Sequence, residues 1–134
     1  MKLSSWTKVL IVLFCFSVAI IGFMVKLPSS FRHHDKELHS LFYFLAAGFL
    51  NVLFAKRNIL IHITIFISLY LFGMAIEYSQ EYSNKVFNNR IHGRYDVEDV
   101  QANLKGLIIF SIVWAVFSAV TYLYKKLKKS EQLT

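Results

Sequence analysis

The chain has 134 residues, of which 56% are hydrophobic and only 17% are charged. Soluble domains average about 45–50% apolar and about 25% charged residues, so both values point to a membrane protein. A single cysteine excludes a disulfide framework and a cysteine-based zinc site. One proline, five glycines and 16% aromatic residues exclude collagen-like and disordered chains. The length predicts a single domain over residues 1–134.

Four uncharged runs along the chain are long enough to cross a bilayer. They cover Val9–Val25, Leu38–Ala55, Ile59–Ile76 and Gly106–Tyr124. At about 1.5 Å per residue, each run covers most or all of the roughly 30 Å hydrocarbon core. The first run exceeds a typical signal-peptide core and no small-residue cleavage site follows it, so we expect it to remain a span. The sequence therefore predicts an all-α polytopic membrane bundle of four transmembrane helices.

The basic residues predict the orientation of the bundle. An even number of spans puts both termini on one side, where basic residues are dense: Lys2, Lys8, Lys56, Arg57, Lys125, Lys126, Lys128 and Lys129. The positive-inside rule places this side in the cytoplasm. Every acidic residue except Glu131 lies on the other side. The net charge of +7 thus reflects topology and contact with the lipid bilayer, and we expect no nucleic-acid partner.

Polar residues at the outer ends of the last three spans follow helical spacing. Each set shares a helix face: Asp35 with His39, Glu77 with Gln80, and Asp96 with Asp99, Asn103 and Gly106. Groups of this kind near hydrocarbon must pair with one another or line a wet cavity. We expect a polar pocket on the outer face, closed by Lys36 and by one arginine, either Arg90 or Arg94. Gly106 is expected to let the fourth helix pack closely.

Several of these residues also have a purely structural interpretation. Asp96 fits the N-cap of the fourth helix, and Asp99 fits an acid of its first turn. His62 is expected to be a hydrogen-bonded core histidine, and Asn51 and Ser111 are expected to form hydrogen bonds between helices.

Three sequence motifs carry a resemblance to a known family. Residues 35–47 read DKELHSLFYFLAA, residues 77–80 read EYSQ and residues 94–106 read RYDVEDVQANLKG. In this order, they resemble the VanZ-like family of small bacterial integral membrane proteins. The matching region, residues 35–106, covers three helices. The family's polar positions map to Asp35, Lys36, His39, Glu77, Gln80, Asp99, Asn103 and Gly106, whereas the family's arginine maps to either Arg90 or Arg94.

The resemblance implies a multi-pass protein of the bacterial cytoplasmic membrane, with a link to tolerance of teicoplanin-type glycopeptides. The first hypothesis is that the outer pocket binds a lipid-linked or cell-wall headgroup, with Lys36 and an arginine on its phosphate or carboxylate.

The second hypothesis is a membrane-embedded enzyme acting on a lipid phosphate. Its catalytic candidates are His39, Glu77 and Asp99, with His39 as general base or acid and Asp35 or Glu77 orienting the ring. No cofactor is evident, but Asp96, Asp99 and Glu77 form a candidate Mg²⁺ site. The third hypothesis is a structural subunit of a larger envelope complex. The sequence leaves the oligomeric state open.

Overall fold

A computed structural model describes residues 3–24, 34–55, 57–88 and 95–132. It contains the helices α1 (Ser5–Met24), α2 (Asp35–Leu50), α3 (Ile59–Val86) and α4 (Val97–Glu131), with a π-helical turn, Asn51–Ala55, continuing α2. Each of the four helices is long and apolar enough to cross a membrane. The predicted bundle of four transmembrane helices is therefore confirmed.

The helices continue past the predicted spans. At about 1.5 Å per residue, α3 is about 42 Å long and α4 about 52 Å, against about 30 Å of hydrocarbon. The predicted spans were bounded by charged residues. A charged residue limits the segment that lipid can bury, but it does not end the helix. The backbone still forms its hydrogen bonds beyond that point, so α3 and α4 are longer than the predicted spans.

The starts of α3 and α4 are fixed by capping side chains. Oδ1 of Asn58 accepts from the backbone N–H groups of Leu60 and Ile61, and Arg57 before it takes a left-handed φ of 71°. Oδ1 of Asp96 accepts from the N–H of Glu98 at 2.8 Å. Such caps satisfy backbone donors that the first helical turn leaves unpaired. The predicted N-cap role of Asp96 is confirmed.

Helices α2 and α4 form the closest pair in the bundle. The buried core lies along α2, α3 and α4, and its members are Tyr43, Ala47, Leu50, Ala55, Ile65, Leu69 and Leu107. Gly106 is the point of closest approach, because a Cβ there would collide with the carbonyl oxygen of Ser40. The expected close packing at Gly106 is confirmed. Most apolar side chains of the second half of α4 point outward, as a lipid-facing helix requires.

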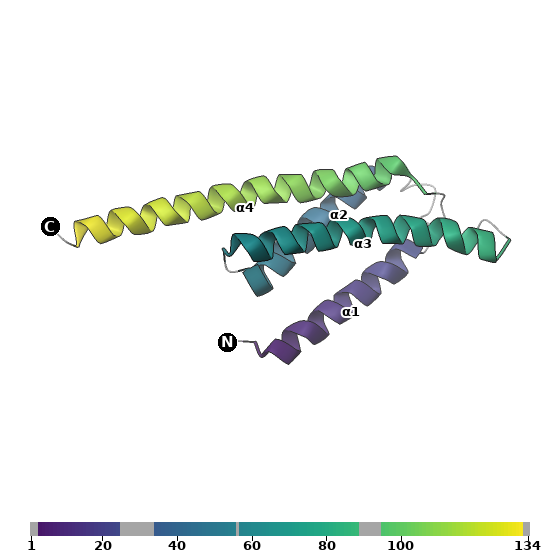
Figure 1. The fold of residues 1–134 in the computed structure, drawn as a ribbon, viewed down its shortest axis with the longest axis horizontal. Helices are drawn as coiled ribbons and strands as arrows, with labels where there is room; N and C mark the ends of the chain where they lie inside the picture. The colour runs from purple at the N-terminus through teal and green to yellow at the C-terminus, as the bar shows by residue number, and fades with distance from the viewer. Residues whose placement is uncertain (1–2, 25–33, 56, 89–94, 133–134) are drawn as a thin grey trace.

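Helix α1 lies along the side of the bundle against α3 (Figure 1), and none of its residues is buried. Polar contacts hold it near both ends. Nζ of Lys8 donates to the carbonyl oxygen of Leu53 in the π-helical turn at 2.8 Å, and Nε2 of Gln80 donates to the carbonyl oxygen of Phe23 at 2.8 Å.

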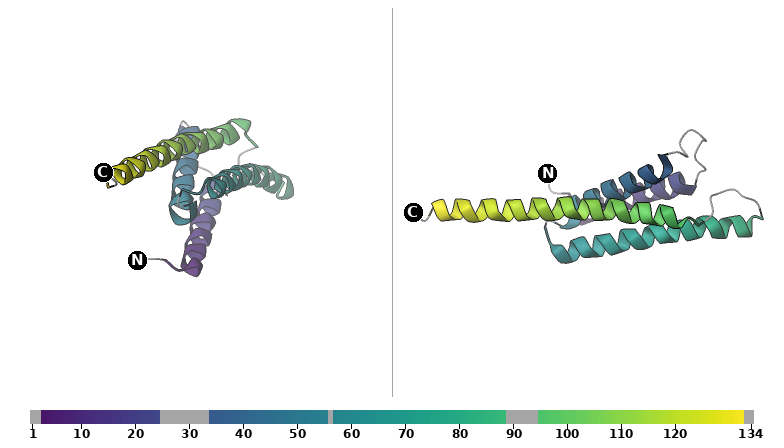
Figure 2. Two further views of the ribbon diagram at one scale, coloured as in Figure 1. Left: turned by 60° about the vertical axis from the view of Figure 1, so that its left-hand side comes forward. Right: turned by 90° about the horizontal axis from the view of Figure 1, so that it is seen from above.

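One end of the bundle gathers the start of α2, the last turns of α3 and the start of α4 (Figure 2). Helix α1 begins and α4 ends at the opposite end (Figure 1). The polar motifs of three helices therefore lie at one end of the bundle, which we call the polar end.

Candidate functional site

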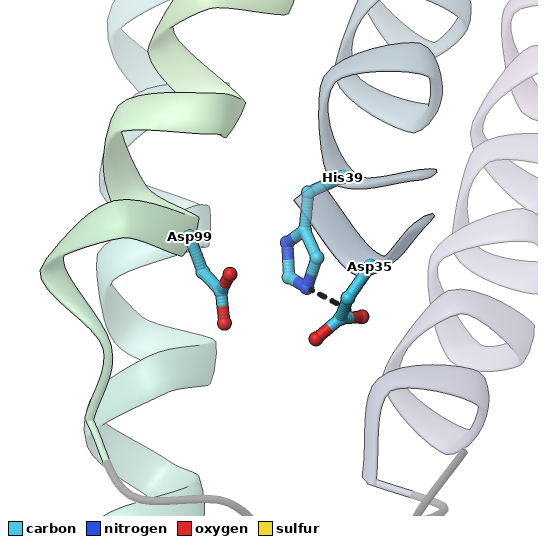
Figure 3. Close-up of side chains that lie close together, drawn as sticks. All are labelled: Asp35, His39 and Asp99. Atoms are coloured by element: carbon cyan, nitrogen blue, oxygen red, sulfur yellow. Dashed lines mark ion pairs between the residues drawn. The ribbon is translucent and has the colours of Figure 1, made fainter. Parts of the chain in front are cut away.

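A buried polar cluster occupies the polar end between α2 and α4. His39 is 6% exposed, Asp99 9% and Asn103 1%. Figure 3 shows the side chains of Asp35 and His39 from α2 pointing toward that of Asp99 from α4. The helical spacing explains the arrangement, because Asp35 and His39 are one turn apart on α2, and Asp99 and Asn103 are one turn apart on α4.

Asn103 fixes the proton on the ring of His39. Nδ1 of His39 donates to Oδ1 of Asn103 at 2.9 Å. An amide oxygen can only accept, so Nδ1 carries a proton and the neutral ring presents its lone pair at Nε2. Nε2 lies 3.8 Å from Oδ1 of Asp35. One ligand atom from each of Asp35, His39 and Asp99 lies within 4.8 Å of the other two.

Asp99 is the member of this cluster whose hydrogen-bonding capacity is least used by the described residues. Its Oδ1 is buried and accepts no hydrogen bond from the described residues. Leaving a buried acceptor unpaired costs about 1–3 kcal/mol, and more for a charged group. Buried polar groups in native proteins are almost always paired, so an unpaired buried carboxylate oxygen calls for an explanation.

Glu77 joins the start of α4 to α3. Its side chain is 1% exposed, and Oε2 accepts from the backbone N–H of Asp96 at 3.2 Å. One helical turn before Glu77, Gly73 provides space for the neighbouring polar groups. A Cβ at Gly73 would lie 2.8 Å from Nδ2 of Asn103 and 2.9 Å from the hydroxyl of Tyr43. Gly73 therefore lets the Asn103 amide reach His39.

The aromatic ring of Phe23 covers the cluster on the α1 side. Its centroid lies 5.1 Å from that of His39. The amide of Gln80 donates to the carbonyl of Phe23, so it ties α1 to α3. Sequence reasoning missed both Phe23 and Gly73. The depth of Phe23 in the last turn of the first span, and the position of Gly73 one turn before Glu77, are the signals that could have found them.

The predicted basic residues lie apart from the cluster or outside the described residues. Lys36 forms an ion pair with Glu98 at the surface. Arg90 and Arg94 both fall outside the described residues. The predicted set thus divides into the cluster formed by Asp35, His39, Asp99 and Asn103, and residues that support it or lie at its edge: Lys36, Glu77, Gln80 and Asp96.

An open groove of about 380 Å³ runs along the surface between α2 and α4. Two lysines, Lys36 and Lys105, lie along it with a mainly apolar lining: Glu37, Ser40, Leu41, Phe44, Ala102 and Ile109. Two ammonium groups beside apolar side chains suit an amphipathic ligand, and the lining also contains one carboxylate, that of Glu37.

A second polar cluster lies deeper in the bundle, near the π-helical turn. Nδ1 of His62 donates to Oδ1 of Asn51 at 2.9 Å, and Nε2 lies 3.2 Å from Oγ of Ser111. The ring stacks on Trp114 with centroids 4.2 Å apart. The predicted core histidine and its interhelical hydrogen bonds are confirmed, and both of its ring nitrogens have partners.

Comparisons with protein-family models, with curated proteins and with solved structures find no match to this chain. The resemblance to the VanZ-like family therefore stays a prediction from the three motifs.

Proposed function

We propose that this chain is a VanZ-like multi-pass protein of the bacterial cytoplasmic membrane that binds the phosphorylated headgroup of a lipid-linked envelope component. The observation that carries this proposal is the groove between α2 and α4, which is lined by two lysines and by apolar side chains. The polar end then faces the exterior, as the dense basic residues at the other end favour. A role in tolerance of teicoplanin-type glycopeptides belongs to the same proposal.

The groove matches both parts of such a lipid. The ammonium groups of Lys36 and Lys105 supply charge-assisted hydrogen bonds to a phosphate. Leu41, Phe44 and Ile109 offer apolar surface to a hydrocarbon chain. Lys36 already pairs with the carboxylate of Glu98, so a phosphate would compete with that carboxylate, which is exposed to solvent and would be hydrated when displaced.

Native mass spectrometry of the detergent-purified chain tests this proposal. The chain is titrated with undecaprenyl phosphate, with undecaprenol as the phosphate-free arm and phosphatidylglycerol as the ordinary anionic lipid. We expect undecaprenyl phosphate to bind most tightly. The double variant Lys36→Ala/Lys105→Ala should weaken that binding about tenfold or more, since a hydrogen bond to a charged group contributes about 1.5–3 kcal/mol.

The matched control removes two lysines from the other end of α4, Lys128→Ala/Lys129→Ala, and should leave the affinity unchanged. Equal affinity for undecaprenol, or no loss in the groove variant, would overturn the headgroup proposal. Stronger binding of phosphatidylglycerol would shift it to a general anionic-lipid site.

A second candidate function is a reaction on the same lipid phosphate. It is favoured by the ring of His39, whose Nε2 faces two carboxylates with the proton held at Nδ1. Release of inorganic phosphate from undecaprenyl diphosphate by the purified chain, lost in His39→Gln, would establish it. Binding of the lipid without release of inorganic phosphate would indicate that the site binds the headgroup and does not hydrolyse it.

A further inference from the structure

The cluster at the polar end has the composition of a metal site. Asp35, His39 and Asp99 each offer one ligand atom, and these three atoms lie within 4.8 Å of one another. Zinc bonds of about 2.0–2.2 Å place tetrahedral ligand atoms about 3.4 Å apart. His39 Nε2 and Asp35 Oδ1, at 3.8 Å, are already near that spacing. Small side-chain rotations would bring all three atoms onto one ion.

A second, independent observation points to a cation here. Asp99 is 91% buried, since its exposed fraction is 9%, and Oδ1 has no hydrogen-bond partner among the described residues. Its carboxylate is directed toward His39 and Asp35 (Figure 3). The surface lysine of this region, Lys36, pairs with Glu98. A cation between the three side chains would satisfy this oxygen, for which the described residues supply no donor.

The histidine is prepared for this role by its neighbour. The hydrogen bond from Nδ1 of His39 to Oδ1 of Asn103 leaves the lone pair at Nε2, on the side where the two carboxylates lie. Histidines that bind metals commonly donate their other ring N–H to an oxygen in this way, which fixes both the tautomer and the ring orientation. Asn103 itself is 1% exposed and held close to Gly73 and Tyr43.

We propose that Asp35, His39 and Asp99 bind one divalent transition-metal ion of the zinc class, with Asn103 positioning the histidine. One imidazole and two carboxylates favour such an ion over Ca²⁺ or Mg²⁺, which prefer oxygen ligands alone. Three protein ligands leave a fourth position open. Asp35, whose side chain is 36% exposed, lies on the accessible side of the cluster. None of the three ligands lines the groove assigned to the lipid headgroup, so the metal site stands independently of the proposed function.

The test measures zinc binding to the full chain in detergent, without added lipid. The protein carries no histidine tag and is first dialysed against a chelator. Equilibrium dialysis with elemental analysis should find one tightly held Zn²⁺ per chain, and a hundredfold excess of Mg²⁺ should not displace it. Asp99→Asn and Asp35→Asn should each weaken binding at least tenfold, and Asn103→Leu should weaken it about 10–100-fold.

The matched control is Glu37→Gln, an exposed carboxylate on the same turn of α2 that is not part of the cluster, and it should bind Zn²⁺ as the unchanged chain does. Asp35 lies at the rim, so its variant keeps the test decisive if the buried Asp99 variant fails to fold. Absence of bound zinc, or equal loss in Glu37→Gln, would overturn the metal site. Neither result would alter the lipid titration, so the two proposals fail separately.

Discussion

Replacing Gly106 by alanine probes the contact on which the polar end depends. A Cβ at this position would lie 2.9 Å from the carbonyl carbon of Ser40 and 3.1 Å from the backbone nitrogen of Phe44, and would collide with the Ser40 oxygen. Ordinary contacts begin near 3.4 Å. The obstructing atoms belong to the backbone of α2, which cannot rotate away as a side chain can. Helices α2 and α4 must therefore separate.

The expected cost follows from two opposing terms. Inserting a methyl group into a packed contact costs about 1–3 kcal/mol, and a rigid backbone on the other side favours the upper end. Alanine in place of glycine returns up to about 1 kcal/mol of helix propensity. We therefore expect Gly106→Ala to lower the free energy of unfolding by about 2 kcal/mol. It should also weaken zinc binding, because His39 on α2 and Asn103 on α4 move apart.

Unfolding by sodium dodecyl sulfate in mixed micelles, followed by tryptophan fluorescence, measures this free energy. The matched control is Gly22→Ala in α1, where a Cβ would meet nothing within 4 Å. That variant should be unchanged or up to about 1 kcal/mol more stable. If Gly106→Ala proves as stable as Gly22→Ala, the close contact between α2 and α4 is wrong.

Three further substitutions test other parts of the structure. Asp96→Ala should lower the free energy of unfolding by about 1 kcal/mol in the same assay through loss of the α4 cap, and Asp96→Asn should restore most of it. His62→Leu should lower it by about 1–3 kcal/mol, because two ring hydrogen bonds are lost, yet leave zinc affinity unchanged. In a background without Cys15, an impermeant maleimide should label Glu37→Cys in intact cells and Ser130→Cys only after lysis. The reverse labelling would refute the proposed orientation.

The membrane spans could be predicted because the cost of burying a charged side chain in lipid depends on residue type, which the sequence gives directly. Charged residues are excluded from the hydrocarbon, so uncharged runs such as Ile59–Ile76 mark what lies inside it. The ends of the helices could not be predicted in this way. Capping by Asn58 and Asp96 decides where α3 and α4 begin, and the π-helical turn at Asn51–Ala55, which contacts α3, has no signal in the pattern of charges.

The faces of the polar helices could also be predicted, but their neighbours could not. Spacing of four residues puts Asp35 with His39, and Asp99 with Asn103, whatever the bundle looks like. Which helix each face meets is decided by tertiary packing. Gln80 shares a helix with Glu77, yet its amide bonds to the carbonyl of Phe23 on α1. The spacing of residues within α3 does not predict which helix the side chain of Gln80 contacts.

The two histidine clusters of this bundle differ in how completely their polar atoms are paired. His62 has a partner at each ring nitrogen, and its amide partner Asn51 donates in turn to the carbonyl of Ala47. A network that satisfies its members in this way joins the helices and needs nothing further. His39 differs, because its ring and two carboxylates gather in one cluster, and Oδ1 of Asp99 there is buried with no hydrogen-bond partner in the described part of the chain. Two histidines with the same exposed fraction of 6% thus differ in their polar surroundings, and this difference is why the metal site is proposed at His39 and not at His62.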